Sequence, residues 1–273
     1  MATTKIQAAP QTAKRSFSAG SVISAIGRWI VRNRIYLIAF AIPAVLTYLA
    51  YALFGLYPFG EESVLCLDLN GQYVYYFEAL RDAFWGDGSI FYNWSRNLSG
   101  EFMGIIGYYL ASPFTLIVML LPEKFMLSSL LIMQLCKLGA AGATFNYFLH
   151  KRRGVQPYPS LLFSTMYAMM AYGVIQLIDP MWLDGLVFLP LIMLGIEYLV
   201  DDGRRLNFII PLALMCVANF YIGYMICFFV ILYFLFYLCF GSDKKRKGYD
   251  YFTAFVRIAY SSVIALACAA FML

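Results

Sequence analysis

Long apolar stretches separated by short polar loops are the feature that most constrains this sequence. Hydrophobic residues make up 62% of the 273 residues and charged residues only 13%, which is too apolar for a soluble domain. Runs of about 18 to 24 mostly apolar residues can cross a hydrocarbon core of roughly 30 Å as helices. We expect these helices near residues 35–56, 126–149, 159–178, 182–200, 207–222, 224–240 and 252–273.

The chemistry of the lipid core fixes the fold class. Inside a bilayer, each backbone N–H and C=O group must be paired within its own segment, which leaves helices and closed barrels. The alternation of apolar and polar residues that is typical of barrel strands is absent from the sequence. We therefore predict an all-α, polytopic transmembrane protein embedded in the lipid bilayer of the cell membrane.

Basic and acidic residues fall in different loops. Lys and Arg precede the first predicted helix and recur at 151–153, 204–205 and 244–247, and short loops rich in these residues face the cytoplasm. We therefore expect a cytoplasmic N-terminus, with residues 1–34 as a basic tail, and acidic loops outside. Because the basic residues lie at helix ends and form no single surface, nucleic-acid binding is not expected.

A polar segment at about residues 57–103 follows the first predicted helix and forms a large first extracytoplasmic loop in this topology. Within it Tyr73, Tyr76, Phe77 and Leu80 recur at helical spacing, with acidic residues on the other side. This pattern predicts an amphipathic helix lying on the membrane surface. Function is expected to concentrate in this loop, because loops carry many binding and catalytic residues.

The next segment, residues 104–121, is apolar enough to span the membrane, but counting crossings argues against it. If it crosses, residues 151–153 lie outside, whereas a re-entrant or interfacial segment returns every basic loop to the cytoplasm. The central Ser112-Pro113 pair fits a broken helix whose freed backbone groups bond to neighbouring protein. We therefore expect a re-entrant or interfacial segment here.

Asp68 is the first candidate for chemistry. It is flanked by leucines and followed by Gln72 and Tyr73. A partly buried carboxylate can act as a general base on an incoming hydroxyl, and the amide and the phenol can orient the acceptor. The alternative is a helix N-cap, in which Asp68 accepts from backbone N–H groups two or three residues on. The spacing alone does not separate these roles.

Further acidic candidates lie in other outer loops. Asp179 and Asp184 stand in a loop that joins two predicted helices with almost no linker, beside Trp182. These three residues could bind a polar headgroup or a sugar. The alternative is a solvated turn with an interfacial tryptophan. Glu101 adds another outer carboxylate in a glycine-containing turn.

Two polar positions interrupt apolar runs. Lys137 lies in the middle of one, where an ionisable group is a functional candidate by default. It could hold a lipid phosphate or pair with an outer acidic group, and the small residues at 139–142 predict close helix packing. Asn219 and Tyr221 stand at a break between two runs and would face the same outer cavity as Asp68.

A series of motifs in this order resembles the bacterial YfhO family over residues 35–240. They are YPFG (57–60), LDLNGQYVYYF, SGEFMG, YYLASPF, LCKLGAAG, MWLDGLVFLPLIMLGIE and NFYIGYM. The resemblance implies a GT-C-like membrane glycosyltransferase, which moves a sugar from a polyprenyl-phosphate carrier to a cell-envelope polymer, such as a teichoic acid, on the outer face. It also implies an essential acidic residue in the first outer loop, a position that Asp68 occupies.

The resemblance implies further roles. Asp179 and Asp184 resemble a second acidic site beside the carrier phosphate, where a divalent metal is a possible cofactor. A phosphate leaving group needs positive charge or metal, so Lys137 or Arg81 is the expected cation. The remaining residues expected to bind substrate are Gln72, Tyr73, Glu101, Trp182, Asn219 and Tyr221.

Family members are longer, so we expect residues 35–273 to be a membrane module truncated at its C-terminus, and inactive as a fragment. A transporter or flippase for a lipid-linked sugar is the alternative, because a broken segment and a mid-helix lysine also suit a substrate pathway. A non-catalytic membrane scaffold is a third hypothesis and would leave the outer carboxylates dispensable. The sequence has no internal repeat of the transporter kind, and the large outer loop favours catalysis.

Overall fold

The computed structural model describes residues 19–95, 99–242, 244 and 246–272. The chain divides into two compact units, Met1–Arg34 and Ile35–Leu273. Helix α1, Ala19–Leu53, begins in the first unit and continues into the second. Residues 19–34 of the predicted tail are therefore helical, and residues 1–18 lie outside the described part of the chain.

Within the described residues, five helical segments are long and apolar enough to cross a membrane. The fold class is confirmed as all-α, and its long apolar helices are those of a multi-pass membrane protein. The five segments are Val22–Leu53, Glu123–Arg153, Pro180–Asp202, Phe220–Gly241 and Gly248–Ala269. They contain α1, α5 (Met126–Phe148), α8 (Leu183–Asp202), α10 (Phe220–Phe236) and α11 (Gly248–Ala269), and α9 (Leu206–Ala218) is a shorter apolar helix.

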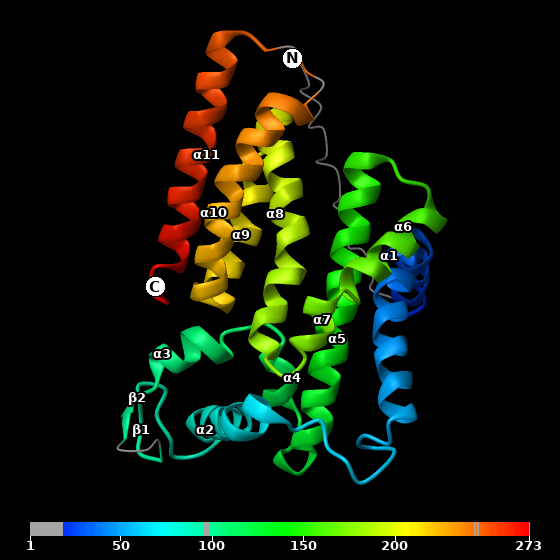
Figure 1. Cartoon of the computed structure of the whole chain (residues 1–273), viewed down its shortest axis with the longest axis vertical. Helices are drawn as coiled ribbons and strands as arrows, with labels where there is room; N and C mark the ends of the chain where they lie inside the picture. The colour runs from blue at the N-terminus through cyan, green and yellow to red at the C-terminus, as the bar shows by residue number, and fades with distance from the viewer. Residues whose placement is uncertain (1–18, 96–98, 243, 245, 273) are drawn as a thin grey trace, which may run out of the picture. The chain divides into compact units, whose positions relative to one another are not determined.

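The unit Ile35–Leu273 is a bundle built around α8. In Figure 1, α5, α8 and α10 run in one direction, and α9 and α11 run in the other. In the apolar stretch of α8, 78% of the residues are buried, against 28% in α11. The ends of α5 and α8 and the starts of α9 and α11 lie at one end of the bundle, which we call the basic end because Arg152, Arg153, Arg204, Arg205 and Arg246 belong to or adjoin these helix ends (Figure 1). The helix α2 (Val74–Trp85), the strand β2 (Gly100–Glu101) and the start of α8 lie at the opposite end, which we call the acidic end because Asp68, Glu101 and Asp179 belong to or adjoin them (Figure 1).

One predicted spanning helix is wrong. Residues 159–178 form two short helices, α6 (Pro157–Ala168) and α7 (Ala171–Ile175), with Met170 extended between them. The chain folds back so tightly that a Cβ on Gly173 would lie 2.2 Å from the carbonyl oxygen of Ala168. Only glycine allows this approach of the backbone. Apolar composition alone does not reveal such a break.

The boundary predicted at residue 223, between the helices at 207–222 and 224–240, is displaced. The break between α9 and α10 falls at Asn219, whose backbone is extended with φ −160°. Its side-chain Oδ1 accepts from the N–H of Ile222 at 2.8 Å. The side chain of Asn219 therefore caps α10, which explains why the helix begins at Phe220.

The segment 104–121 is broken, as the Ser112-Pro113 pair suggests. It contains α3 (Met103–Ile105), a π-helical turn (Ile106–Leu110) and α4 (Thr115–Leu120), with residues 111–114 outside any helix. The carbonyl groups at the end of α4 are bonded by α2 (Val74–Trp85), because Arg81 Nη1 donates to Val118 O at 2.6 Å. The placement of this broken segment in a membrane stays a prediction.

The amphipathic helix expected within residues 57–103 is present, and its position on the membrane surface stays a prediction. A π-helical turn, Leu69–Tyr73, leads into α2. Tyr73, Phe77 and Leu80 are buried, whereas Glu78 and Asp82 on the other side are exposed. A short antiparallel pair, β1 (Tyr92–Asn93) and β2 (Gly100–Glu101), completes the loop.

The predicted close packing after Lys137 is confirmed. A Cβ on Gly142 would lie 2.5 Å from the carbonyl oxygen of Ala39, and one on Gly139 would lie 2.8 Å from that of Phe40. The absence of side chains at these two positions lets α1 and α5 approach backbone to backbone.

Lys137 and Asp184 form an enclosed ion pair between α5 and α8. Lys137 Nζ lies 2.7 Å from Asp184 Oδ2, and the two side chains are 1% and 0% exposed. Lys137 Nζ also donates to the carbonyl oxygen of Pro180 at 2.7 Å, and Ser112 Oγ donates to Asp184 Oδ1 at 2.8 Å. Of the two expected roles of Lys137, pairing with an acidic group is therefore the one observed.

Loss of one member of this pair is expected to destabilise the bundle. Lys137→Met leaves Asp184 charged in an apolar interior, at a cost of about 3–5 kcal/mol. Adding Asp184→Leu removes the unpaired charge and should recover most of the loss. Thermal unfolding of the purified protein in detergent measures both, with the exposed Lys124→Met as the control. Equal melting temperatures for Lys137→Met and the wild type would contradict this role.

The arrangement of residues 104–121 predicts which loops share a side of the membrane. In a background without natural cysteines, Asn70→Cys and Glu123→Cys should both react with an impermeant thiol reagent applied outside intact cells. Gln156→Cys should react only after permeabilisation, because it lies at the basic end. Reaction of Asn70→Cys and Glu123→Cys from opposite sides would mean that residues 104–121 cross the membrane.

Candidate functional site

Five polar residues, which we call the outer cluster, gather at the acidic end of the bundle. They are Asp68, Gln72, Tyr73, Tyr109 and Asp179. Gln72 Nε2 donates to Asp68 Oδ1 at 3.3 Å, and the Tyr109 hydroxyl donates to Gln72 Oε1 at 3.1 Å. The amide of Gln72 therefore links Asp68 to the turn that follows α3.

Asp68 is an exposed carboxylate at the start of the π-helical turn Leu69–Tyr73. Its side chain makes no capping hydrogen bond to that turn. The N-cap alternative is therefore wrong, and the carboxylate is held by the side chain of Gln72 instead. An exposed carboxylate with one fixed partner can accept a proton or a hydrogen bond from a ligand.

Asp179 and Tyr73 lie close enough to influence each other. Burial raises the pKa of Asp179, the charge of Asp68 raises it further, and the Tyr73 hydroxyl opposes both effects. Burial likewise raises the pKa of Tyr73, and Asp179 adds to that rise. The Tyr73 hydroxyl is buried and faces Asp179. A neutral hydroxyl therefore lies beside a carboxylate whose pKa is raised.

Aromatic rings extend the outer cluster toward α10. The ring of Tyr109 lies 5.2 Å from that of Tyr73 and 4.7 Å from that of Tyr108. Tyr221 lies 6.0 Å from both Tyr108 and Trp182. Two residues predicted to bind substrate, Trp182 and Tyr221, therefore join one aromatic wall with Tyr73, Tyr108 and Tyr109.

Asn219 lies behind this wall. It is completely buried, and its Nδ2 donates to the carbonyl oxygen of Tyr108 at 2.7 Å while its Oδ1 caps α10. Both ends of its amide are therefore engaged. Asn219 fixes the position of Tyr108 and is not turned toward a ligand.

A large open cleft adjoins the outer cluster along α2. Its volume is about 1040 Å³, and Gln72 belongs both to its lining and to the outer cluster. The lining combines aromatic and polar side chains, among them Tyr76, Glu78, Asp82 and Trp85. This combination suits a ligand that presents both apolar faces and hydroxyl groups.

Three other residues predicted to bind substrate are engaged with the protein. Arg81 lines the cleft, but its Nη1 bonds the carbonyl groups at the end of α4. Lys137 is enclosed with Asp184. Glu101 Oε2 accepts from the N–H of Gly104 at 2.7 Å, which holds β2 against the start of α3. None of these contacts reaches a ligand, and each positions the backbone around the cleft.

The carboxylates at the acidic end allow the metal prediction to be examined. The residues described contain no group of three or more His, Cys, Asp or Glu side chains that could hold a metal. Asp184 is completely buried and bonded to Lys137 and Ser112. Asp179 is half-buried near Asp68. The predicted metal at Asp179 and Asp184 stays a prediction.

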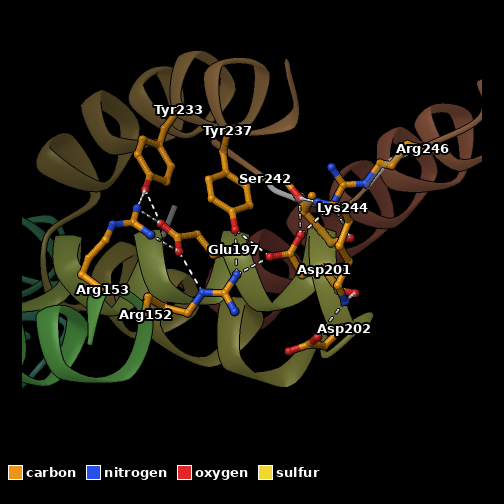
Figure 2. A network of polar contacts seen from close by, with 11 residues as sticks. Arg152, Arg153, Glu197, Asp201, Asp202, Tyr233, Tyr237, Ser242, Lys244 and Arg246 are labelled. Carbon is orange, nitrogen blue, oxygen red and sulfur yellow. Dashed lines mark hydrogen bonds and ion pairs between the residues drawn. The ribbon is translucent and has the colours of Figure 1, made fainter. Parts of the chain in front are cut away.

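The largest polar network in the described chain lies at the basic end and was not anticipated from the sequence (Figure 2). Arg152 donates to Glu197 at 2.8 Å and is also paired with Asp201. Arg153 pairs with Glu197 at 2.6 Å, and the hydroxyl of Tyr233 donates to the same carboxylate at 2.5 Å. These contacts join α8 and α10 to the π-helical turn Leu149–Arg153 that follows α5. Glu197, an ionisable residue inside an apolar run, was the available signal.

Comparison with known proteins gives the family. A family model described as "Bacterial membrane protein YfhO" matches residues 39–273. The chain is also 27% identical over 167 residues to "Uncharacterized protein YfhO" of Bacillus subtilis (strain 168), an alignment that covers 55% of this chain and 19% of that protein. No solved structure matches the chain. The resemblance drawn from the motifs is thereby confirmed, and the chain belongs to the YfhO family of bacterial membrane proteins.

Proposed function

We propose that this chain carries the membrane-embedded reaction site of a GT-C-like glycosyltransferase. The enzyme moves a sugar from a polyprenyl-phosphate carrier to a cell-envelope polymer, such as a teichoic acid, at the outer membrane face. The observation that carries the proposal is the outer cluster, in which the exposed Asp68 and the half-buried Asp179 influence each other beside an open cleft. Paired carboxylates in unlike environments are typical of acid and base chemistry.

Asp68 is the proposed general base. It accepts the proton of an acceptor hydroxyl, whose oxygen then replaces the carrier phosphate at the anomeric carbon of the sugar. Gln72 holds one oxygen of Asp68, and Tyr109 holds Gln72, so the orientation of the base is set before substrate binds. The second oxygen of the carboxylate is left to meet the acceptor.

Asp179 and Tyr73 are the proposed partners of the donor. The buried Tyr73 hydroxyl, which faces Asp179, can donate to a substrate oxygen. The leaving phosphate needs a counter-charge, and Lys137 and Arg81 are committed elsewhere. A divalent cation at Asp179 would supply that charge.

The cleft supports a sugar or polyol as the acceptor. Tyr75, Tyr76 and Trp85 offer aromatic faces, and Glu78 and Asp82 offer acceptors for hydroxyl groups. Because Gln72 lines the cleft and bonds Asp68, a hydroxyl of a polymer lying in the cleft comes close to the proposed base.

Asp68→Asn is expected to abolish sugar transfer. Asparagine keeps the size of the side chain and its hydrogen bond to Gln72, but it removes the charge and the basicity, so the rate should fall about 10²–10⁴-fold. Glycosylation of the polymer is measured in cells that lack the native gene and carry each version of the full-length protein at matched membrane levels. The exposed outer residue Glu61 provides the control Glu61→Gln. Near wild-type transfer by Asp68→Asn would refute the base and favour a scaffold.

Asp179→Asn is expected to lower transfer and yet to stabilise the protein at neutral pH. The folded pKa of Asp179 is raised above its ordinary value of 3.8, so the folded state loses stability as pH rises from 3.8 through the raised pKa. Asparagine removes that loss, so the variant should melt at a higher temperature at pH 7. The difference should vanish below pH 4, where both states are protonated. A melting temperature below that of the wild type at pH 7 would contradict the prediction.

A further inference from the structure

Arg257 is a charged residue inside an apolar helix without an acidic partner in the described chain. It lies about 13 Å along α11, at a rise of 1.5 Å per residue, and it is half-buried. Its guanidinium makes no hydrogen bond or ion pair with the residues that the structure describes. A charged group within a membrane helix has a high free-energy cost, so it is a candidate for binding a partner.

The guanidinium of Arg257 lies against the turn that ends α8. Its Nη1 is 3.3 Å and its Cζ 3.5 Å from the place that a Cβ on Gly203 would occupy. Gly203 ends α8 with a left-handed φ of 69°. The charge of Arg257 is therefore level with a helix end, where lipid headgroups begin, although its backbone belongs to an apolar segment.

Two further arginines stand on the same turn. Arg204 and Arg205 are exposed, and Arg205 Cζ lies 5.8 Å from the ring centre of Tyr260. Tyr260 follows Arg257 by three residues on α11, so the two side chains share one face of that helix. Arg205 and Arg257 therefore share this face of α11, whereas the guanidinium of Arg204 lies 5.3 Å from the ring centre of Tyr198 on α8.

The neighbouring carboxylates do not neutralise these groups. Asp201 is bonded to Arg152 and Arg246, and Asp202 is paired with Lys244 at 3.3 Å. In addition, α9 begins at Leu206 without a side-chain cap, so the positive end of its dipole points to the same turn. The local charge is positive and has no counter-charge in the described residues.

We propose that Arg205 and Arg257 bind the phosphate of an anionic phospholipid. Guanidinium groups suit phosphate because they donate paired hydrogen bonds. A lipid is favoured over a free anion because Phe252, Val256 and Tyr260 of α11 are exposed and apolar around Arg257. The acyl chains would lie on this surface while the headgroup meets the arginines. Loop position explains Arg205 by topology alone, but it does not explain Arg257 within the helix.

Lipid retention tests the proposal. The purified protein is released from bilayers of phosphatidylglycerol and phosphatidylcholine, and the lipids that stay bound are counted by native mass spectrometry. Each basic residue near a membrane contributes about 1 kcal/mol to binding anionic lipid, or roughly fivefold. Arg257→Gln should therefore lower retained phosphatidylglycerol about fivefold without changing phosphatidylcholine, and Arg257→Lys should keep part of it.

The matched control is Lys151→Gln, which removes an exposed cation at the basic end that rests 5.6 Å from the ring of Tyr147. An equal loss of phosphatidylglycerol in this variant would reduce the effect to general attraction and overturn the proposal. Release of the lipid by inorganic phosphate, but not by chloride of equal ionic strength, would identify a site for a free anion instead. A lower melting temperature of Arg257→Gln in lipid-free detergent would assign Arg257 a partner within the chain, which also overturns it.

Discussion

The enclosed ion pair of Lys137 and Asp184 is the interaction on which the acidic end of the bundle depends. Both charges lie where water does not reach, so neither can lose its partner without leaving an isolated charge in an apolar interior. Lys137 of α5 bonds Pro180 in the loop before α8, and Asp184 bonds Ser112 in the break before α4. These contacts hold both segments against α5. The place of Asp179, one residue before Pro180, is set by these contacts.

Several residues that looked like ligands hold the outer cluster in place. Both ends of the Asn219 amide are bonded to backbone groups, and Arg81 bonds the carbonyl groups at the end of α4. The side chains left with free capacity are Asp68, Tyr73 and Asp179, supported by Gln72 and Tyr109. Supporting residues that are fixed by hydrogen bonds preorganise the proposed site for its ligand.

The sequence predicts those features of this chain that arise locally. The spacing of Tyr73, Phe77 and Leu80 gave α2, the small residues after Lys137 gave close packing, and Ser112-Pro113 gave a break. What it could not supply is the identity of partners. A carboxylate at a loop end has the same sequence pattern whether it faces solvent, as Asp68 does, or pairs with an enclosed ammonium group, as Asp184 does. The same limit hid the contacts of Glu197 and the fold of residues 157–175.

The two ends of the bundle are fastened by different means, and this difference has a mechanical consequence. At the basic end, Glu197 and Asp201 of α8 bind the arginines that follow α5, Tyr233 of α10 and Tyr237 just beyond it, through several charged contacts (Figure 2). At the acidic end, α10 meets the π-helical turn Ile106–Leu110 through ring contacts with Tyr108 and the single amide of Asn219. Weak contacts of this kind separate at a lower free-energy cost than charged ones. We therefore expect α10 to move away from this turn about a pivot at Glu197, so that an opening for a bulky ligand lies between them.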